Sequence, residues 1–257
     1  MDYLKHLIIR TPLYGALSRL RHAINFWERR KHPGLRHIHD EPAYIDTMLR
    51  RVVNESSNCV DVGSHLGSML VQMLRLAPRG EHVAFEALPR KAQWLRRRFP
   101  EVTVHQVALS DTPGAITFYE NLERSGFSGM TPHQYHDERF REHTVRGERL
   151  DNLLPEAYRA DFLKIDVEGA EFKVLQGAER VLRDSRPVVL FECTYSGLSQ
   201  YGIPPKAVYL FLTEQHRYDV FAVGDWVKNG TPLTQSEFVD ALVYPFRAFN
   251  FLAVPRK

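Results

Sequence analysis

Residues 60–69 read VDVGSHLGSM, a short apolar run that contains one acid, Asp61, and is followed by a loop with two glycines. This order predicts a buried strand, a tight turn and then a helix, the unit that opens nucleotide-binding α/β sheets. The dinucleotide fingerprint needs glycine at positions 63, 65 and 68, but His65 and Ser68 occupy two of these positions. NAD binding is therefore disfavoured. Gly63 instead predicts a sharp backbone turn under another ligand, and Gly67 predicts close packing of the following helix.

Strands and helices alternate from this point along the chain. Predicted strands occupy residues 58–63, 82–87, 102–109, 115–120, 160–167, 187–193, 219–223 and 249–254, and predicted helices 69–77, 90–99, 170–183 and 206–216. This alternation predicts the α/β class, with a Rossmann-like, doubly wound, mostly parallel sheet and helices on both faces. The strand at 115–120 is expected to be antiparallel or at an edge. Residues 121–149 have no clear period and are interpreted as a long functional loop.

The region before this alternation is basic and helical in pattern. Apolar residues recur at helical spacing between positions 13 and 27, which predicts an amphipathic helix, and a second helix is predicted over 43–53. Pro33-Gly34 is expected to be the hinge of this region. The chain is thus predicted to consist of an N-terminal helical extension, residues 1–57, and a ligand-binding domain, residues 58–257.

Composition narrows the partners and the location. The net charge of +3 is too small to indicate a nucleic-acid partner, although the residues before position 40 are basic. Such an end is either a solvated face or a contact for an anionic membrane surface or a partner. No apolar run is long enough to cross a bilayer and no signal peptide is evident, so the expected location is the cytoplasm, free or membrane-peripheral. Cys59 and Cys193 are predicted to be buried free thiols.

An acid at the end of the second predicted strand supports a nucleoside ligand. Glu86 follows Gly63 by 23 residues, the separation at which a carboxylate accepts hydrogen bonds from ribose hydroxyls. The alternative, an exposed surface glutamate, explains the apolar run before it poorly. The pattern Asp-x-Gly-x-x-x-Gly at 61–67 resembles motif I of class I S-adenosylmethionine-dependent methyltransferases, whose donor has a free ribose diol, as NAD has.

Further segments resemble the FkbM-type methyltransferases, a family of S-adenosylmethionine-dependent O-methyltransferases. They are VDVGSHLG, FEALP, VALSDTPGAITF, LDNLL, FLKIDVEGAEFKVLQGA, RPVVLFE and FNFLAVP, and they cover roughly residues 58–255. The segment that begins FLKIDVEG is the most specific. The chain departs from the family pattern at Gln106, where asparagine is expected, and in FEALP, where proline more often follows the glutamate.

The resemblance implies S-adenosylmethionine as the methyl donor and a hydroxyl of a sugar, glycan or natural product as the acceptor. It also implies donor contacts for Gly63, Gly67 and Glu86, with Ala108 and either Ser110 or Asp111 near the adenine. Asp61 is expected close to the cationic amino-acid end of the donor. His65, inside the glycine loop, is expected either to approach the methionine moiety or to be solvated.

Two strand ends offer candidate catalytic groups. A hydroxyl is a poor nucleophile near neutral pH, so a base that accepts its proton is expected. Asp166 ends one core strand and Glu192 ends the next, and both carboxylates should face one crevice if these strands are neighbours. One would then be the base and the other would orient the substrate. Alternatively, the pair would hold a divalent cation that lowers the pKa of the acceptor hydroxyl.

Three nearby charged residues have different expected roles. Glu168 lies in a loop from which it can reach the acceptor, and it is a third catalytic candidate. Glu171 is interpreted as a structural residue at the start of the next helix. Lys164, inside the strand, is expected to pair with an acid.

Two other functions compete with hydroxyl methylation. One is an idle Rossmann-like module that binds a ligand or scaffolds a complex, and the acids at several strand ends weigh against it. The other is methylation of nitrogen. Enzymes that methylate nucleic-acid nitrogen often carry an Asn/Asp-Pro-Pro-Tyr/Phe motif after the fourth strand, where this chain has DVEG.

Overall fold

The computed structural model describes residues 35–132 and 139–256. The helix predicted between residues 13 and 27 and the hinge at Pro33-Gly34 lie outside the described residues. The first described helix, α3 (Arg36–Val52), is longer than the helix predicted over 43–53, and its Met48 and Leu49 pack into the core. The division of the chain at residue 57 stays a prediction.

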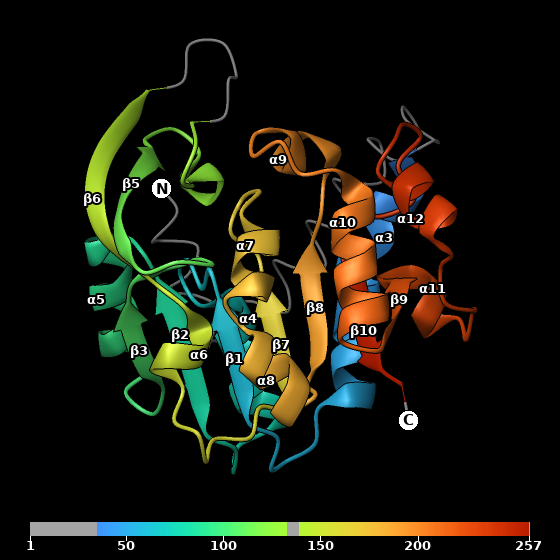
Figure 1. Cartoon of the computed structure of the whole chain (residues 1–257). Helices are drawn as coiled ribbons and strands as arrows, with labels where there is room; N and C mark the ends of the chain where they lie inside the picture. Colours follow the sequence, from blue (N-terminus) through green and yellow to red (C-terminus); the bar gives the residue numbers. More distant parts are fainter. Residues whose placement is uncertain (1–34, 133–138, 257) are drawn as a thin grey trace.

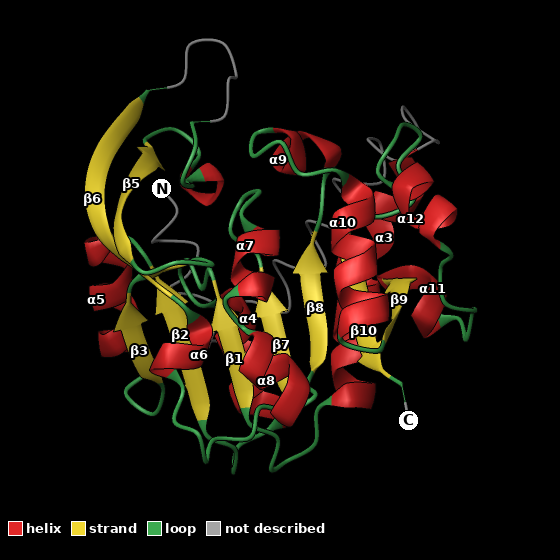
Figure 2. Ribbon diagram, viewed as in Figure 1, coloured by secondary structure: helices red, strands yellow, loops and turns green. Residues whose placement is uncertain are grey.

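A seven-stranded sheet forms the centre of the fold, in the order β3-β2-β1-β7-β8-β10-β9 (Figures 1 and 2). Its strands are β1 (Cys59–Val62), β2 (His82–Glu86), β3 (Thr103–Gln106), β7 (Phe162–Ile165), β8 (Val188–Glu192), β9 (Tyr218–Ala222) and β10 (Asn250–Pro255). Pairing is parallel from β3 to β8, whereas β10 is antiparallel to both β8 and β9. Because the strand order reverses at β1, the carboxyl ends of β1 and β7 flank the switch point at which such sheets bind ligands.

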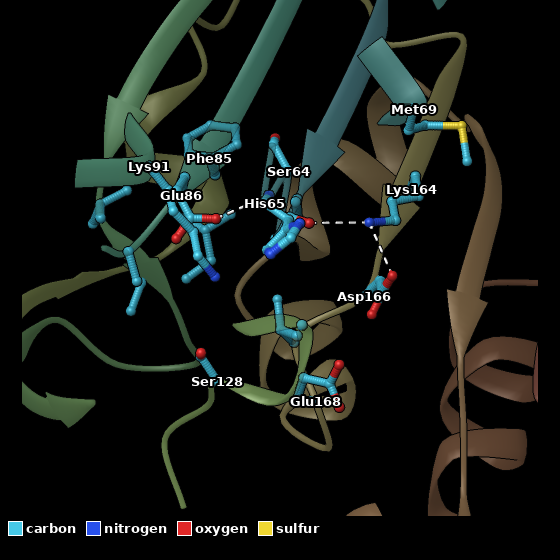
Figure 3. A pocket seen from close by; sticks show the side chains of 18 of the residues that line it. Ser64, His65, Met69, Phe85, Glu86, Lys91, Ser128, Lys164, Asp166 and Glu168 are labelled. Carbon is cyan, nitrogen blue, oxygen red and sulfur yellow. Dashed lines mark hydrogen bonds and ion pairs between the residues drawn. The ribbon is translucent and has the colours of Figure 1, made fainter. Parts of the chain in front are cut away.

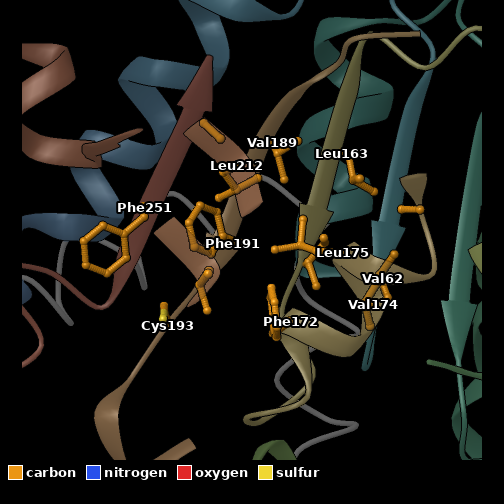
Figure 4. Packing of buried hydrophobic residues seen from close by; sticks show 14 of the residues in the cluster. Val62, Leu163, Phe172, Val174, Leu175, Val189, Phe191, Cys193, Leu212 and Phe251 are labelled. Atoms are coloured by element: carbon orange, nitrogen blue, oxygen red, sulfur yellow. The ribbon is translucent and has the colours of Figure 1, made fainter. Parts of the chain in front are cut away.

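Helices cover both faces of this sheet, which confirms the predicted fold class. One face packs against α3, α4 (Ser68–Leu76), α5 (Pro89–Arg98) and α11 (Val223–Val227). The other packs against α6 (Leu150–Leu153), α7 (Glu171–Gln176), α8 (Glu179–Asp184), α10 (Pro205–Leu210) and α12 (Gln235–Ala241). In this second layer, Phe172 and Leu175 of α7 meet Val62, Leu163 and Phe191 of the sheet (Figure 4).

Alternate residues of each strand point to opposite faces of the sheet. Val60 and Val62 of β1 belong to the apolar cluster beneath α7, and Cys59 belongs to the cluster beneath α4. Asp61 has the same parity as Cys59 and pairs in register with Lys164 of β7. The Asp61 and Lys164 side chains therefore leave the sheet side by side on the α4 face.

A second sheet of three strands lies next to the carboxyl ends of β2 and β3 (Figure 1). It consists of β4 (Ala108–Leu109), β5 (Gly114–Asn121) and β6 (Phe140–Glu148), in the order β4-β6-β5. The edge position of β5 and its antiparallel pairing confirm the expectation for residues 115–120. The single strand predicted over 102–109 is wrong, because the chain bends at Val107, whose N–H donates to the Glu86 carbonyl, and β4 then pairs with β6.

The predicted long loop over 121–149 is wrong for its second part, which forms β6. Residues on both faces of β6 are polar over most of its length, so the strand has no apolar period that would reveal it. Its stability comes instead from antiparallel pairing with β5, whose register extends from Phe140 to Gly147.

Two predicted helices are also divided. The helix predicted over 170–183 is α7 and α8, with a break at Gly177, where a Cβ would lie 2.2 Å from the Ser110 carbonyl oxygen. The helix predicted over 206–216 passes from α10 into a π-helical turn, Phe211–Gln215. Within the described part of the chain, no helix has the length and apolar character needed to cross a membrane. Cys59 and Cys193 are buried free thiols, as predicted.

Candidate active site

A cavity of about 300 Å³ opens at the carboxyl ends of β1, β2 and β7 (Figure 3). Its walls come from the glycine loop, the ends of these strands, β4, and the segment 126–130 that follows β5. The residues predicted for the site that line this cavity are Gly63, His65, Glu86, Ala108, Asp166 and Glu168. The cavity therefore occupies the switch point at which the sequence places the ligand.

The two loop glycines are required by contacts as well as by backbone angles. Gly63 has φ +74°, and a Cβ there would lie 1.8 Å from the carbonyl oxygen of Asp166. Gly67 has φ +86°, and a Cβ there would lie 2.3 Å from the Phe99 ring. The first glycine lets the loop touch the end of β7, and the second lets α4 pack close to α5, as predicted for Gly67. Contact of either glycine with the donor stays a prediction.

Glu86 is buried, with 6% of its surface exposed, yet its carboxylate faces the cavity. Its Oε2 accepts from the His65 N–H at 2.9 Å and its Oε1 from the Leu88 N–H at 2.9 Å. Burial raises the pKa of Glu86, although the Lys91 ammonium and these two hydrogen bonds oppose the rise. Since a carboxylate offers about four acceptor positions, two remain available for the hydroxyls of a ribose.

Lys164 is paired with acids, as predicted. Its Nζ lies 3.4 Å from Asp61 Oδ1 and 3.1 Å from Asp166 Oδ2, and it donates to the Gly63 carbonyl at 3.1 Å (Figure 3). Asp61 is fully buried beneath the cavity, and burial raises its pKa while the Lys164 charge opposes the rise. Asp61 thus touches the site through Lys164 rather than from the cavity wall.

Asp166 and Glu192 stand together because β7 and β8 are neighbouring parallel strands. Oxygens of their carboxyl groups lie within 4.8 Å of each other, so the charge of each affects the ionisation of the other. Burial, reinforced by the charge of Asp166, raises the pKa of Glu192 well above its usual value. Burial alone would raise the pKa of Asp166, but the Lys164 ammonium and the hydrogen bond with Glu192 outweigh it and lower that pKa. The two pKa values are thus driven apart, and Asp166 is the more acidic member of the pair.

Glu168 is a third acid at the cavity. Burial, followed by the charges of Asp166 and Glu171, raises its pKa to about 8. Glu168 and His65 have left-handed backbones, with φ +59° and +51°, a conformation that costs a non-glycine residue about 1–3 kcal/mol and is concentrated at functional sites. Carboxylate oxygens of Asp166, Glu168 and Glu192 lie within 4.8 Å of one another. The divalent-cation alternative stays a prediction.

Glu171 is structural, as predicted, and begins α7. Its Oε1 accepts from the backbone N–H of Val167 at 2.9 Å and of Gly169 at 3.1 Å, so the carboxylate holds the turn that carries Glu168. Burial raises its pKa from 4.5 to about 7 against the effect of these hydrogen bonds.

Glu171→Gln should therefore change how stability depends on pH. A raised pKa means that wild-type protein loses stability as pH rises from 4.5 through about 7, whereas glutamine does not titrate. We expect the wild type to lose about 1–3 kcal/mol relative to Glu171→Gln between pH 5 and pH 8, measured by urea unfolding. Glu156→Gln, at the exposed surface, is the control. An equal difference between wild type and Glu171→Gln at both pH values would contradict this role.

Other predicted donor residues lie outside the cavity wall. Gly67 acts through helix packing, and the catalytic candidate Glu192 is likewise not among the residues that line the cavity. Ser110 Oγ donates to Asp111 Oδ1 at 2.9 Å, and Asp111 also lies 3.6 Å from the Lys173 ammonium on α7. Contact of Ser110 or Asp111 with an adenine stays a prediction.

Residues 121–149 are assigned to a functional loop from the sequence, but none of the residues by which this segment lines the cavity is named there. Ser125 accepts at its carbonyl from Lys91 Nζ at 2.7 Å, and its hydroxyl shares a hydrogen bond with His65 Nε2 at 2.8 Å. Gly126, Ser128 and Met130 of the same segment line the cavity. Lys91 belongs to a helix rich in basic residues, and no pattern distinguishes it from its neighbours.

The site fits the donor that the sequence implies. Gly63 allows close approach of the backbone, and Glu86 keeps acceptor positions for a diol. Apolar side chains line the cavity next to Glu86 and form a surface suited to a purine; they are Phe85, Val107, Leu109 and Phe118. A glycine loop after β1, an acid after β2 and acids after β7 and β8 together define a Rossmann-like methyltransferase site.

Comparison with known proteins identifies the family. The sequence model of the methyltransferase FkbM domain matches residues 61–221. The chain belongs to the FkbM methyltransferase family, and the donor of this class is S-adenosylmethionine.

Among curated proteins, the chain is 30% identical to methyltransferase sdnD of Sordaria araneosa over 50% of this chain and 63% of that protein. It is 30% identical to the AMB antimetabolite synthetase AmbE of Pseudomonas aeruginosa over 57% of this chain and 9% of that protein. The chain thus spans less than two thirds of the length of either relative.

Solved structures with a similar fold are more distant in sequence. The FkbM methyltransferase of Methylobacillus flagellatus is 16% identical, with a TM-score of 0.47 over 78% of this chain and 44% of that one. An O-methyltransferase of Bacillus cereus in complex with SAH is 15% identical, with a TM-score of 0.44 over 83% of this chain and 79% of that one.

Proposed function

We propose that the protein transfers a methyl group from S-adenosylmethionine to a hydroxyl of a sugar, glycan or natural-product acceptor. The observation that carries this proposal is the Asp166 carboxylate at the cavity, 3.1 Å from the Lys164 ammonium and within 4.8 Å of the Glu192 carboxyl group. A hydroxyl must lose its proton as it attacks, and an ionised carboxylate near the attacking oxygen accepts that proton. The Asp166 side chain is 39% exposed, so an acceptor can reach it from the cavity.

S-adenosylmethionine, when bound, supplies a methyl group on a positively charged sulfur. The residues of the chain then have two tasks. Glu86 and the glycine loop hold the nucleoside so that the acceptor oxygen meets the methyl carbon in line, a proximity effect that in favourable cases is worth roughly 7–11 kcal/mol. Asp166 accepts the hydroxyl proton, a contribution of about 10²–10⁴-fold.

The protonated acids fit an acceptor with several hydroxyl groups. Glu168, whose pKa is raised to about 8, is largely protonated at neutral pH, and the pKa of Glu192 is also raised well above its usual value. A protonated carboxyl group both donates and accepts hydrogen bonds, which suits neighbouring hydroxyls of a polyol. An acceptor with a phosphate close to the reacting hydroxyl would instead meet the charge of Asp166.

The test uses methyl-labelled S-adenosylmethionine and fractionated glycans, lipids and small molecules. Label in a base-stable, acid-stable ether of a hydroxyl compound is the expected result. Label found only in amines, protein or nucleic acid would contradict hydroxyl methylation. Absence of donor binding in calorimetry, together with no transfer to any fraction, would instead favour an idle module.

Turnover is expected to persist in excess chelator. Lys164 already places a cation 3.1 Å from Asp166, and the raised pKa of Glu192 opposes a second negative charge beside it, so Asp166 has a counter-charge without a metal ion. The measurement is the rate of methyl transfer with EDTA, then with added Mg²⁺. Loss of activity in EDTA that Mg²⁺ restores would favour the divalent-cation alternative.

A further inference from the structure

Lys164 is a charged residue in the centre of the sheet. It lies in β7, between β1 and β8, and only 8% of its surface is exposed. A buried ammonium is costly unless each of its hydrogens has an acceptor. The cost of burying the Lys164 ammonium must therefore be offset by polar contacts, which the apolar core around it does not provide.

The Lys164 ammonium contacts three different segments, through one hydrogen bond and two ion pairs. Asp61 Oδ1 at 3.4 Å belongs to β1, the Gly63 carbonyl at 3.1 Å to the glycine loop, and Asp166 Oδ2 at 3.1 Å to the end of β7. Figure 3 shows Lys164 between the loop and Asp166. One side chain thus ties the donor-binding loop to the proposed base.

Asp61 makes Lys164 difficult to replace. Asp61 is completely buried, and within the described residues neither of its carboxylate oxygens has a hydrogen bond of ordinary geometry. The Lys164 ammonium is the cation that balances it. Without that ammonium, the buried Asp61 and the nearby Asp166 would be two carboxylates with no cation between them, and a proton would be taken up to relieve the repulsion.

We propose that Lys164 is a positioning residue that selects Asp166, among the acids around the cavity, as the base for methyl transfer. The inference rests on the proposed function, since it concerns how that base is kept ionised. Lys164 also lines the cavity, and in this account it affects the reaction through Asp166.

The groups around Asp166 make this selection necessary. It is faced by Glu192 from β8, by Glu168 and Glu171 from the following turn and α7, by Asp61 from β1, and by His65 from the glycine loop. The charge of Asp166 raises the pKa of each of these acids, whereas Lys164 and, after it, a hydrogen bond with Glu192 lower the pKa of Asp166. The pKa of Lys164 is itself raised by Asp166 and Asp61 against the effect of burial, so the ammonium stays charged across the working pH range.

The test compares Lys164→Met, Lys164→Arg and wild type in the pH dependence of kcat/KM. The acidic limb of this profile is the pH range in which kcat/KM falls as the base becomes protonated. In Lys164→Met the midpoint of this limb should shift to higher pH by at least one unit. At pH values below the new midpoint, kcat/KM should then be at least tenfold lower than in wild type, and it should recover as pH rises. Lys164→Arg, which keeps the charge, should leave the limb within about half a unit of wild type. Lys228→Met removes a lysine that lies over the Tyr44 ring, far from the cavity, and is the control for loss of one positive charge. A folded Lys164→Met with an unmoved limb overturns the proposal.

A second measurement separates this inference from the proposed function. Carboxyl ¹³C shifts of the unliganded wild type are titrated, with Asp166→Asn used to assign the Asp166 signal. Ionisation of Asp166 below the usual range of aspartate supports the proposal, and ionisation in the usual range or above it overturns the proposal. The kinetic test cannot be carried out if wild-type protein methylates no acceptor or if Lys164→Met does not fold. In either case this titration is sufficient to support or overturn the proposal.

Discussion

Asp166→Asn should lower kcat for methyl transfer by about 10²–10⁴-fold, because asparagine cannot accept the proton of the attacking hydroxyl. The side chain keeps its size and can still accept from Lys164, so the donor dissociation constant should change by less than about threefold. Rapid-quench measurement of a single turnover separates this chemical step from product release.

The matched control is Asp240→Asn, the same substitution at an exposed residue of α12. It should leave kcat and the melting temperature unchanged. An Asp166→Asn protein that is folded, binds the donor and turns over at the wild-type rate would remove Asp166 from the catalytic role. Glu168 would then be the next candidate for the base, because of the three catalytic candidates Asp166, Glu168 and Glu192 it is the other one that lines the cavity.

Gly63→Ala should abolish tight donor binding and destabilise the fold. Its Cβ would lie 1.8 Å from a backbone oxygen of Asp166, which cannot rotate away, and its φ of +74° is unfavourable for alanine. The clash and the backbone strain together should lower the free energy of unfolding by about 2–5 kcal/mol. The donor dissociation constant should rise at least tenfold, measured by calorimetry at a temperature at which the variant is folded.

Gly202→Ala isolates the contribution of the clash. Gly202 also has a left-handed backbone, with φ +65°, but a Cβ added there would have no atom within 4 Å. Only the backbone strain, about 1–2 kcal/mol, should appear there, with donor binding unchanged. Equal effects of the two substitutions would mean that the contact between Gly63 and the end of β7 is not what requires glycine.

The core of the fold could be predicted because its strands are short apolar runs bounded by turns. That pattern identified β1, β2, β7 and β8 and the acids at their ends. It left open whether Asp166 and Glu192 meet, since local periodicity does not determine strand order. The structure shows that β7 and β8 are neighbouring parallel strands, and this pairing brings Asp166 and Glu192 together.

The cover of the cavity could not be predicted, for physical reasons. Strand β6 is polar on both faces, and the segment around Ser125 is held by a buried Asn121 side chain that accepts from the N–H of Glu123 and Arg124. Such bonds organise a loop without any apolar repeat. The contacts of Ser125 with His65 and Lys91 join segments that are distant in sequence, and no local pattern reports them.

The position of β10 has a consequence for the order in which the protein is made. Although β10 follows every other strand of the sheet in the chain, it lies in the interior of the sheet, between β8 and β9. Synthesis has to reach residue 255 before β9 can join, and until then the edge of β8, which carries Glu192, has no partner on that side. A nascent chain stopped before Asn250 would expose that edge to other chains, so we expect such fragments to be bound by chaperones or to aggregate rather than to fold into a smaller enzyme.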